Sequence, residues 1–379
     1  MDLTVTALPR YAFYRTGHSR RHGSPPTPLC SEIGIDHPVV QAPVGSVSTP
    51  SLAAAVADAG GLGMLAMSWR EADAIRDAYT DAANATDGVV GVNVVLDEST
   101  GVLSPSACLD ACLDAGAPVD SFSVGDAGPY IDRVHEVGGT VMVTVASAAE
   151  ARAAVDAGAD VVVAQGREAG GHVQSDVTTM SLLPRVADGV PVPVVAAGGL
   201  GDGRGLAAAL TLDADGGWFG TRFVATEESG AHEAYRQQIV DAPETATRFP
   251  TCSTGAGRTS HTECSKPTRS ASTAFTDHVW SATAASPNKS PMRRRRADSR
   301  SADTPPLAGM TGDVEALPHY AGQSTGLAQD VRPAGEVVAR LVSDARAALA
   351  DASAAAEWAD PPTAPVWRAG TGFRLRKRF

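Results

Sequence analysis

The chain has 379 residues, of which 43% are hydrophobic, so it can hold one α/β barrel of about 250 residues with further segments to spare. Its net charge is −12, and this balance argues against a nucleic acid as the main partner, because proteins that bind duplexes carry a basic surface. Only three of the 31 basic residues are lysines, a composition that suits a salt-rich cytoplasm and equally a genome that prefers arginine codons.

The five cysteines are scattered and match neither a disulfide framework nor a paired zinc motif. Cys108 and Cys112 lie four residues apart on an expected helix, where two small core residues are a better interpretation than a shared metal. No apolar run is long enough to span a membrane, and the N-terminus lacks the apolar segment of a secretory signal. We therefore expect a cytoplasmic protein that binds no metal, membrane or nucleic acid.

Residues 1–30 are polar and irregular, whereas residues 37–245 alternate short β-branched runs with Ala-rich stretches, which predicts parallel strands joined by crossover helices. Nearly continuous apolar runs indicate strands that are buried on both faces. The count of eight units favours a closed (β/α)8 TIM barrel over residues 31–245, rather than a doubly wound open sheet. The expected strands are Val39–Gln41, Leu62–Leu65, Val89–Val95, Ser121–Val124, Thr140–Val145, Val161–Gln165, Val194–Ala197 and Gly217–Gly220; helices are expected over Ser51–Ala59, Ala146–Ala157 and Gly203–Leu212.

The stretch 246–306 breaks this pattern, because it is rich in Ser, Thr, Arg and Pro and carries ten basic residues against four acidic ones. This composition predicts a low-complexity segment that does not pack against the barrel. The chain then returns to a helical pattern over Asp313–Ala350, so residues 307–352 are expected to form a C-terminal helical part, followed by a tail at 353–379. Its expected core positions are Val337, Val338, Leu341 and Val342.

A Gly-rich loop that ends in His172 follows the sixth expected strand. Barrel enzymes place their active sites at the C-terminal ends of the strands. The glycines let the loop approach a ligand, and a histidine, which titrates near neutral pH, suits a general base. A lone histidine is more often structural, but its place in this loop favours a catalytic role.

Glycines also follow the seventh and eighth strands, at Gly198–Gly199 and at Gly220. Barrels commonly bind phosphate at these loops, through backbone N–H groups and a helix N-terminus. Neither loop matches the P-loop or the dinucleotide pattern, so the pair predicts a cofactor with a phosphate. Two weaker signals are Ala42-Pro43, a rigid turn that can lie against a flat ring, and Asn93, whose amide can both donate and accept hydrogen bonds.

Together these segments resemble the nitronate monooxygenase family, once called 2-nitropropane dioxygenases. The match covers roughly residues 28–245 and 310–345. The matching segments, in the order and spacing of the family, are QAPVGSVSTPSLAAAVADAGGLGML, GVN, QGREAGGH, PVVAAGGLGDGRGLAAAL, GTRFVATEESGAH and TGDVEALPHYAGQSTGL. The resemblance implies an FMN enzyme that oxidises alkyl nitronates or nitroalkanes with O2 to a carbonyl compound and nitrite.

The resemblance also implies the residues of the site. His172 falls on the family's catalytic histidine, which removes the proton beside the nitro group or positions the nitronate. The residues expected to contact the flavin are Ala42, Pro43, Val44, Asn93, Gln165 and Gly171; those expected around its phosphate are Gly198, Gly199, Gly220 and Thr221; and Gln323 is expected to reach the flavin site from the C-terminal part.

Three departures from the family bear on this interpretation. Val44 stands where the family usually has Met, and Gln174 where a Gly often follows the histidine, so substrate choice can differ. The stretch 246–306 replaces ordered family sequence, which favours a segment translated out of frame over a genuine insertion.

Two other functions stay open. One is an NAD(P)H-dependent enoyl-ACP or quinone reductase on the same barrel, and the other is a flavin-binding protein without turnover. Accepting a hydride requires no base, so His172 favours the oxidation of nitronates.

Overall fold

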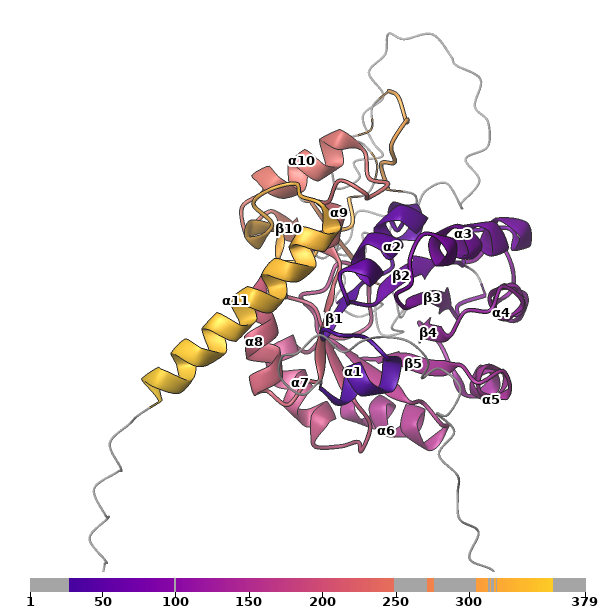
Figure 1. The fold of residues 1–379 in the computed structure, drawn as a ribbon, viewed down its shortest axis with the longest axis horizontal. Helices are drawn as coiled ribbons and strands as arrows, with labels where there is room; N and C mark the ends of the chain where they lie inside the picture. The colour runs from indigo at the N-terminus through magenta and orange to yellow at the C-terminus, as the bar shows by residue number, and fades with distance from the viewer. Residues whose placement is uncertain are drawn as a thin grey trace, which may run out of the picture.

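The computed structural model describes residues 27–98, 100–248, 271–275, 305–312, 314, 317 and 319–356. Eight parallel strands form its centre, with helices around them (Figure 1). Their order is β1-β9-β8-β6-β5-β4-β3-β2, and a parallel bridge between Val40 and Leu62 joins the first strand to the last. This confirms the predicted (β/α)8 barrel. The strands are β1 Val39–Gln41, β2 Gly63–Ala66, β3 Val90–Val95, β4 Val119–Ser123, β5 Thr140–Val145, β6 Val161–Gln165, β8 Val194–Ala197 and β9 Gly216–Phe219.

Local sequence signals fix where several helices begin. The hydroxyl of Thr49 accepts a hydrogen bond from the N–H of Leu52, and Asp202 caps its helix in the same way. Proline in the first turn fits because its missing N–H has no partner to lose there. The helices are α1 Pro28–Ile33, α2 Pro50–Asp58, α3 Ala72–Asn84, α4 Pro105–Asp114, α5 Gly128–Glu136, α6 Ala148–Asp156, α7 Thr179–Ala187, α8 Gly203–Thr211, α9 Thr221–Val224, α10 Glu233–Asp241 and α11 Ala334–Ala355.

Apolar side chains fill two layers. Inside the barrel, residues of α1 such as Leu29 and Ile33 pack with Val40 and Met142, so α1 closes the N-terminal end of the barrel. A larger cluster lies between the strands and the surrounding helices, and Cys108 and Cys112 belong to it as buried residues of α4. The favoured interpretation of these cysteines, as small core residues, agrees with this position. The C-terminal end of the barrel stays open for a site.

The helix α11 begins at Ala334, not at Asp313 as the sequence pattern predicted. Pro333 stands at its N-cap, and a proline restricts the residue before it to an extended backbone, which disfavours a helix through this point. The four expected core positions of this helix are buried, and α11 packs along α8 and α2 (Figure 1). The chain before it forms a loop whose described residues reach the open end of the barrel.

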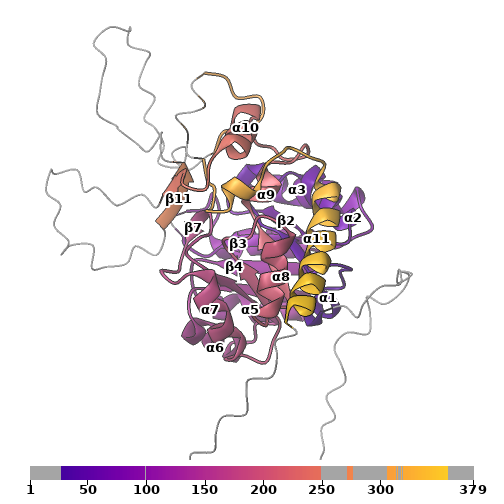
Figure 2. The ribbon, with the colours of Figure 1, turned by 90° about the vertical axis from the view of Figure 1, so that its left-hand side faces the viewer.

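An unpredicted strand, β7 Gly171–Val173, carries His172. It pairs antiparallel with β11 Ala271–Phe275 (Figure 2). In turn, β11 pairs antiparallel with β10 Thr247–Arg248. Residues 271–275 belong to the stretch 246–306, which was predicted not to pack into the barrel, and they pair with β7 and not with a barrel strand. Residues 271–275 are small or β-branched and end in an aromatic residue, and such residues are common in strands. They pair with the free edge of β7. Most other residues of the stretch lie outside the described part.

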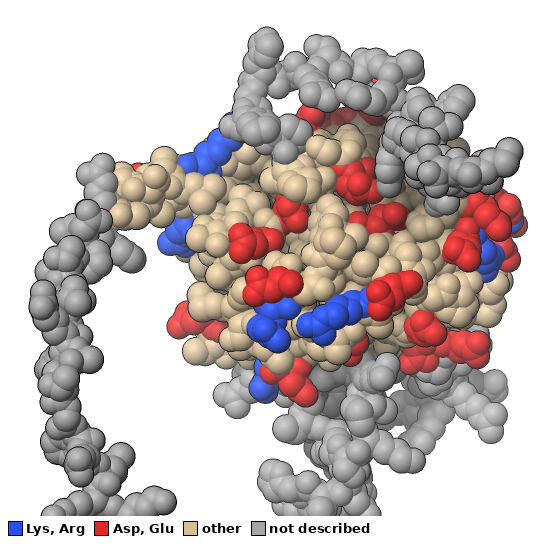
Figure 3. Space-filling model, turned by 90° about the horizontal axis from the view of Figure 1, so that it is seen from below, with Lys and Arg blue, Asp and Glu red and all other residues tan. Residues whose placement is uncertain are grey.

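The described surface is acidic. On the face seen in Figure 3, Asp and Glu side chains are spread widely, and the fewer Lys and Arg side chains lie beside them. That face shows no broad positive area of the kind that binds a phosphate backbone. Each helix of the described residues is too short or too polar to cross a membrane.

Candidate functional site

A pocket of about 310 Å³ opens at the C-terminal ends of the barrel strands, a size within the range of small-ligand sites. Each of the eight barrel strands, or the loop that follows it, contributes to its wall. It thus lies where barrels place their active sites. All predicted site residues except Gln323 line it, together with residues that the sequence analysis did not select: Trp69, Val95, Val102, Ser123, Val124, Thr144, Glu168, Trp218, Tyr320, Gly322 and Ser324.

His172 is half-buried, and its backbone is held by Gln165 at the end of β6. The amide nitrogen of Gln165 donates to the carbonyl of His172 over 3.3 Å, and its amide oxygen accepts from the N–H of Gln174 over 2.9 Å. Gln165 therefore lines the pocket, as predicted, and also fixes the position of β7.

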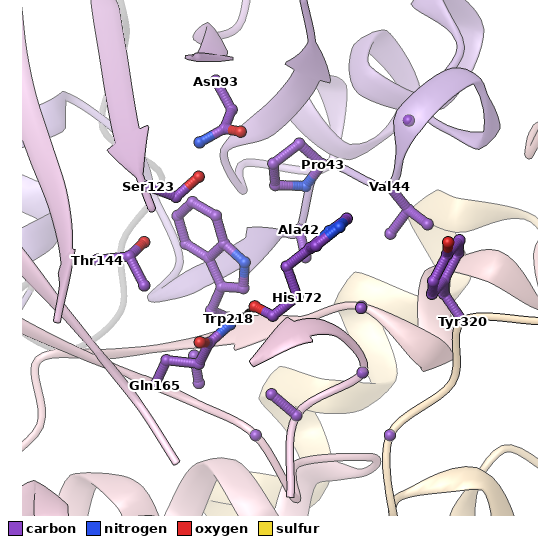
Figure 4. A pocket seen from close by; sticks show the side chains of 18 of the residues that line it. Ala42, Pro43, Val44, Asn93, Ser123, Thr144, Gln165, His172, Trp218 and Tyr320 are labelled. Atoms are coloured by element: carbon purple, nitrogen blue, oxygen red, sulfur yellow. Dashed lines mark hydrogen bonds between the residues drawn. The ribbon is translucent and has the colours of Figure 1, made fainter. Parts of the chain in front are cut away.

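Two aromatic rings flank the imidazole of His172. The ring centroid of Trp69 lies 6.5 Å from that of His172, and the ring of Tyr320 lies 6.1 Å away, each within about 26° of parallel. Figure 4 shows His172, on β7, beside Tyr320, on the segment before α11. Trp69 follows the end of β2, so examining every strand end would have found it, whereas Tyr320 comes from a loop far along the sequence.

The loops after β8 and β9 form a cradle suited to an anion. Gly198 and Gly199 have φ values of 101° and 77°, which glycine adopts readily, and a Cβ on Gly198 would come within 2.9 Å of the nitrogen of Ala169. After β9, Thr221 begins the short helix α9, in which the N–H groups of Phe223 and Val224 bond to the carbonyl of Gly220, so the donors that its N-terminus offers are those of Thr221 and Arg222. The hydroxyl of Thr221 accepts from the N–H of Gly322 over 2.9 Å and so keeps its own proton to donate. These donors fit one phosphate group.

Flat and apolar groups lie beside this cradle. Ala42, Pro43 and Val44 follow β1, and the indole of Trp218 faces the same space (Figure 4). The buried side chain of Gln41 fixes this turn: its nitrogen donates to the hydroxyl of Ser48 over 3.0 Å, and its oxygen accepts from the N–H of Met64 over 2.9 Å. A planar ring system fits against such a wall.

Polar side chains from three neighbouring strands line another side of the pocket: Asn93 of β3, Ser123 of β4 and Thr144 of β5 (Figure 4). The amide nitrogen of Asn93 donates to the carbonyl of Ser121 over 3.0 Å, which fixes its orientation. A ring with apolar faces and hydrogen-bonding edges, joined to a phosphate, matches the whole arrangement. The residues present therefore fit a flavin.

Glu168 lines the pocket, but its carboxylate is occupied by hydrogen bonds within the protein. It accepts hydrogen bonds from the N–H of Thr179 over 2.9 Å and from its hydroxyl over 3.1 Å, and so caps α7. The carbonyl of Gly198, 2.9 Å from the same hydroxyl, shares its single proton with Glu168. Glu168 therefore braces the His172 loop against the phosphate loop.

The segment before α11 closes the pocket through Tyr320, Gly322 and Ser324. The phenol of Tyr235, on α10, donates to the carbonyl of Tyr320. Gln323 departs from its prediction, because its side chain is exposed and does not line the pocket. Its backbone N–H donates to the carbonyl of Glu168 over 2.9 Å, so at this position the segment meets the pocket wall through its backbone.

A buried arginine, Arg222, holds the segment before α11 at a second point, Asp330. Arg222, next to Thr221, donates to the carbonyl of Asp330 over 2.8 Å and pairs with its carboxylate at 3.2 Å. Burial lowers the pKa of Arg222, while a hydrogen bond from Arg332 lowers the pKa of Asp330, so the pair stays charged. The ion pair joins the phosphate loop to the C-terminal part.

Comparison with known proteins agrees with this geometry. The sequence profile described as nitronate monooxygenase matches residues 27–107 and 104–344. The chain belongs to the nitronate monooxygenase family. A nitronate monooxygenase of Paraburkholderia phytofirmans is 30% identical over 352 residues, which are 82% of this chain and 92% of that protein.

A second group of relatives carries a different name. The (3aS,4S,5R,7aS)-5-hydroxy-7a-methyl-1-oxo-octahydro-1H-indene-4-carboxyl-CoA dehydrogenase of Mycobacterium tuberculosis is 39% identical over 219 residues, 57% of this chain. The alignment spans only 60% of that relative's length.

Two solved structures share the fold over most of this chain. The structure of FabK from Thermotoga maritima, 29% identical, covers 88% of this chain and 100% of its own with a TM-score of 0.72. The nitroalkane oxidase from Streptomyces ansochromogenes, 30% identical, covers 86% and 100% with a TM-score of 0.70.

Proposed function

We propose that this chain is an FMN-dependent enzyme that oxidises alkyl nitronates with O2 to a carbonyl compound and nitrite. The observation that carries the proposal is the position of His172, which lines the pocket between two aromatic rings. Membership of the family and similarity to a nitroalkane oxidase support it.

The residues that would hold FMN come from three parts of the barrel. Gly198, Gly199, Gly220 and Thr221 would take the phosphate, while the turn at Ala42–Val44 would lie against the ring. Bound FMN supplies the redox chemistry, because it can take electrons from an organic substrate and return them to O2.

His172 has two tasks in this proposal. A neutral imidazole removes the proton from the carbon beside a nitro group, and the resulting imidazolium then stabilises the anionic nitronate beside it. A preformed nitronate needs only the second task. Trp69 and Tyr320 flank the imidazole, and with substrate bound they would reduce its contact with water, which would strengthen its attraction for the anion.

We predict that the bound cofactor is FMN and not FAD. The two glycine loops offer donors for one phosphate, and the sequence has no dinucleotide pattern. Heat-released cofactor from the purified protein should show the mass of FMN. Recovery of FAD, or of no flavin after reconstitution with FMN, would contradict this part of the proposal.

We predict that the holoenzyme consumes O2 when given an alkyl nitronate and no NADH. The nitronate itself supplies the electrons, so no nicotinamide is needed. An oxygen electrode measures the uptake, and a colour reaction for nitrite measures the product. Absence of both, with FMN bound, would reject oxidation of nitronates as the function.

A second candidate is a flavin oxidoreductase that acts on a thioester. Two relatives at 39% identity carry the name of a carboxyl-CoA dehydrogenase, and His172 could equally remove a proton beside a thioester carbonyl. Anaerobic bleaching of the flavin by an acyl-CoA, with no response to nitronates, would favour this candidate. Bleaching by NADH would instead favour the reductase considered in the sequence analysis.

A further inference from the structure

Val124 has a backbone conformation that β-branched residues rarely adopt. Its φ is 57°, in the left-handed region, directly after β4 ends at Ser123. For a β-branched residue this is a genuine outlier, and such outliers persist where the surrounding structure forces them. The next residue, Gly125, has a φ of 158°. The left-handed conformation therefore falls on the β-branched Val124 and not on the glycine beside it.

The strained residue lines the pocket together with three apolar side chains. These are Val95 at the end of β3, Val102 in the loop after β3 and Trp69 in the loop after β2. Ser68 ties these loops together: its hydroxyl accepts from the N–H of Val95 over 2.8 Å, and its carbonyl accepts from the N–H of Val102 over 2.8 Å. This apolar side, made by Trp69, Val95, Val102 and Val124, is thus a braced wall.

Val124 lies across the barrel from the loop after β9. The strand order places β4 four strands from β9 in a ring of eight, which is the opposite side. The imidazole of His172 lies near the apolar side, with its ring centroid 6.5 Å from that of Trp69. A substrate whose reacting carbon is at His172 can therefore direct its carbon chain toward Val124.

We propose that Val124 limits the length of the substrate's carbon chain and restricts the enzyme to short-chain alkyl nitronates. The proposal rests on the proposed function. The pocket, at about 310 Å³, is at the lower end of ligand sites, and a flavin ring would take much of it. The strained backbone holds the isopropyl group of Val124 in the space that remains, where it stops a longer chain.

The strain is tested by comparing Val124→Gly with Val124→Ala. At an ordinary φ alanine is the more stabilising residue, whereas at a φ of 57° glycine should be, so Val124→Gly should melt above Val124→Ala by roughly 2 °C. Asp213 is a matched control, because its φ is 65° and it is exposed in the loop before β9, at the other end of the barrel. The same order is expected for Asp213→Gly and Asp213→Ala.

The steric role is tested by binding, without turnover. Straight-chain carboxylates are planar anions shaped like nitronates, and their binding to the FMN-loaded protein is measured by the change in the flavin's visible spectrum. Wild type should bind short carboxylates and lose affinity as the chain grows. Both Val124 variants should bind the long carboxylates at least about tenfold more tightly than wild type does. One methylene that does not fit an apolar pocket changes the affinity by about this factor. The Asp213 variants should keep the wild-type profile.

The relative kcat/KM values for a series from nitroethane nitronate to nitrohexane nitronate should shift in the same direction. If wild type oxidises nitronates but the Val124 variants keep its chain-length profile, the inference is wrong. If no variant oxidises any nitronate while the carboxylate profile still shifts, the limit at Val124 stands and the proposed function fails. A higher melting temperature for Val124→Ala than for Val124→Gly would show that Val124 is not held in a strained conformation.

Discussion

Replacing His172 with alanine should lower the turnover of neutral nitroalkanes by about 10²–10⁴-fold, the usual worth of general acid–base catalysis. Preformed nitronates should lose much less, because they arrive already deprotonated. FMN should stay bound, since the phosphate cradle and the turn at Ala42–Val44 do not involve the imidazole. Initial rates with a nitroalkane and with its own nitronate, measured on one FMN-loaded preparation, give the comparison.

A matched control is His37→Ala, which removes a histidine just before β1 at the N-terminal end of the barrel, away from the pocket. Its rates should equal those of wild type on both substrates. An equal loss on both substrates for His172→Ala would show that the residue positions the anion and is not the base.

The barrel could be predicted because its signals are local. The strands β1, β5, β6 and β8 are short runs of mostly β-branched or small apolar residues, and their predicted bounds agree with the structure. Gly198 and Gly199 after β8 were equally readable, because their positive φ values leave few other residues possible. Gly220 after β9 has a φ of −97°, so only its place after a strand indicated it. Periodicity and glycine placement thus located the cradle from sequence alone.

The rest of the site depends on contacts between distant parts of the chain. Tyr320 approaches His172 only because Gly322 and Gln323 bond to the barrel loops, and no local pattern encodes those bonds. The same applies to β7, which is a strand through its pairing with β11. The resemblance to the family brought the C-terminal segment to the site but selected Gln323, whose side chain is exposed.

The strand β4 was placed two residues late because it contains a carboxylate that no strand pattern predicts. Asp120 is fully buried, and neither of its oxygens has a hydrogen-bond partner among the described residues. Its neighbour Phe122 packs in the layer between strands and helices, and alternation along the strand places Asp120 on that same side. Burial raises the pKa of Asp120 to about 8. Since this value lies above the 3.8 of an exposed aspartate, the folded state holds a proton that the unfolded state releases.

The protein should therefore lose stability as the pH rises from about 4 to 8, by an amount on the order of 5 kcal/mol for this group, at about 1.4 kcal/mol for each unit of pKa. Asp120→Asn keeps the shape without the charge, so it should remove this slope, and Asp120→Val should raise the free energy of unfolding most at high pH. Urea unfolding of wild type and both variants at pH 5 and pH 9 measures the difference. Asp213→Asn, at an exposed site, is the control and should keep the wild-type slope. A wild-type slope in Asp120→Asn would mean that Asp120 is ionised in the folded protein and has a partner, such as a bound cation, in the core.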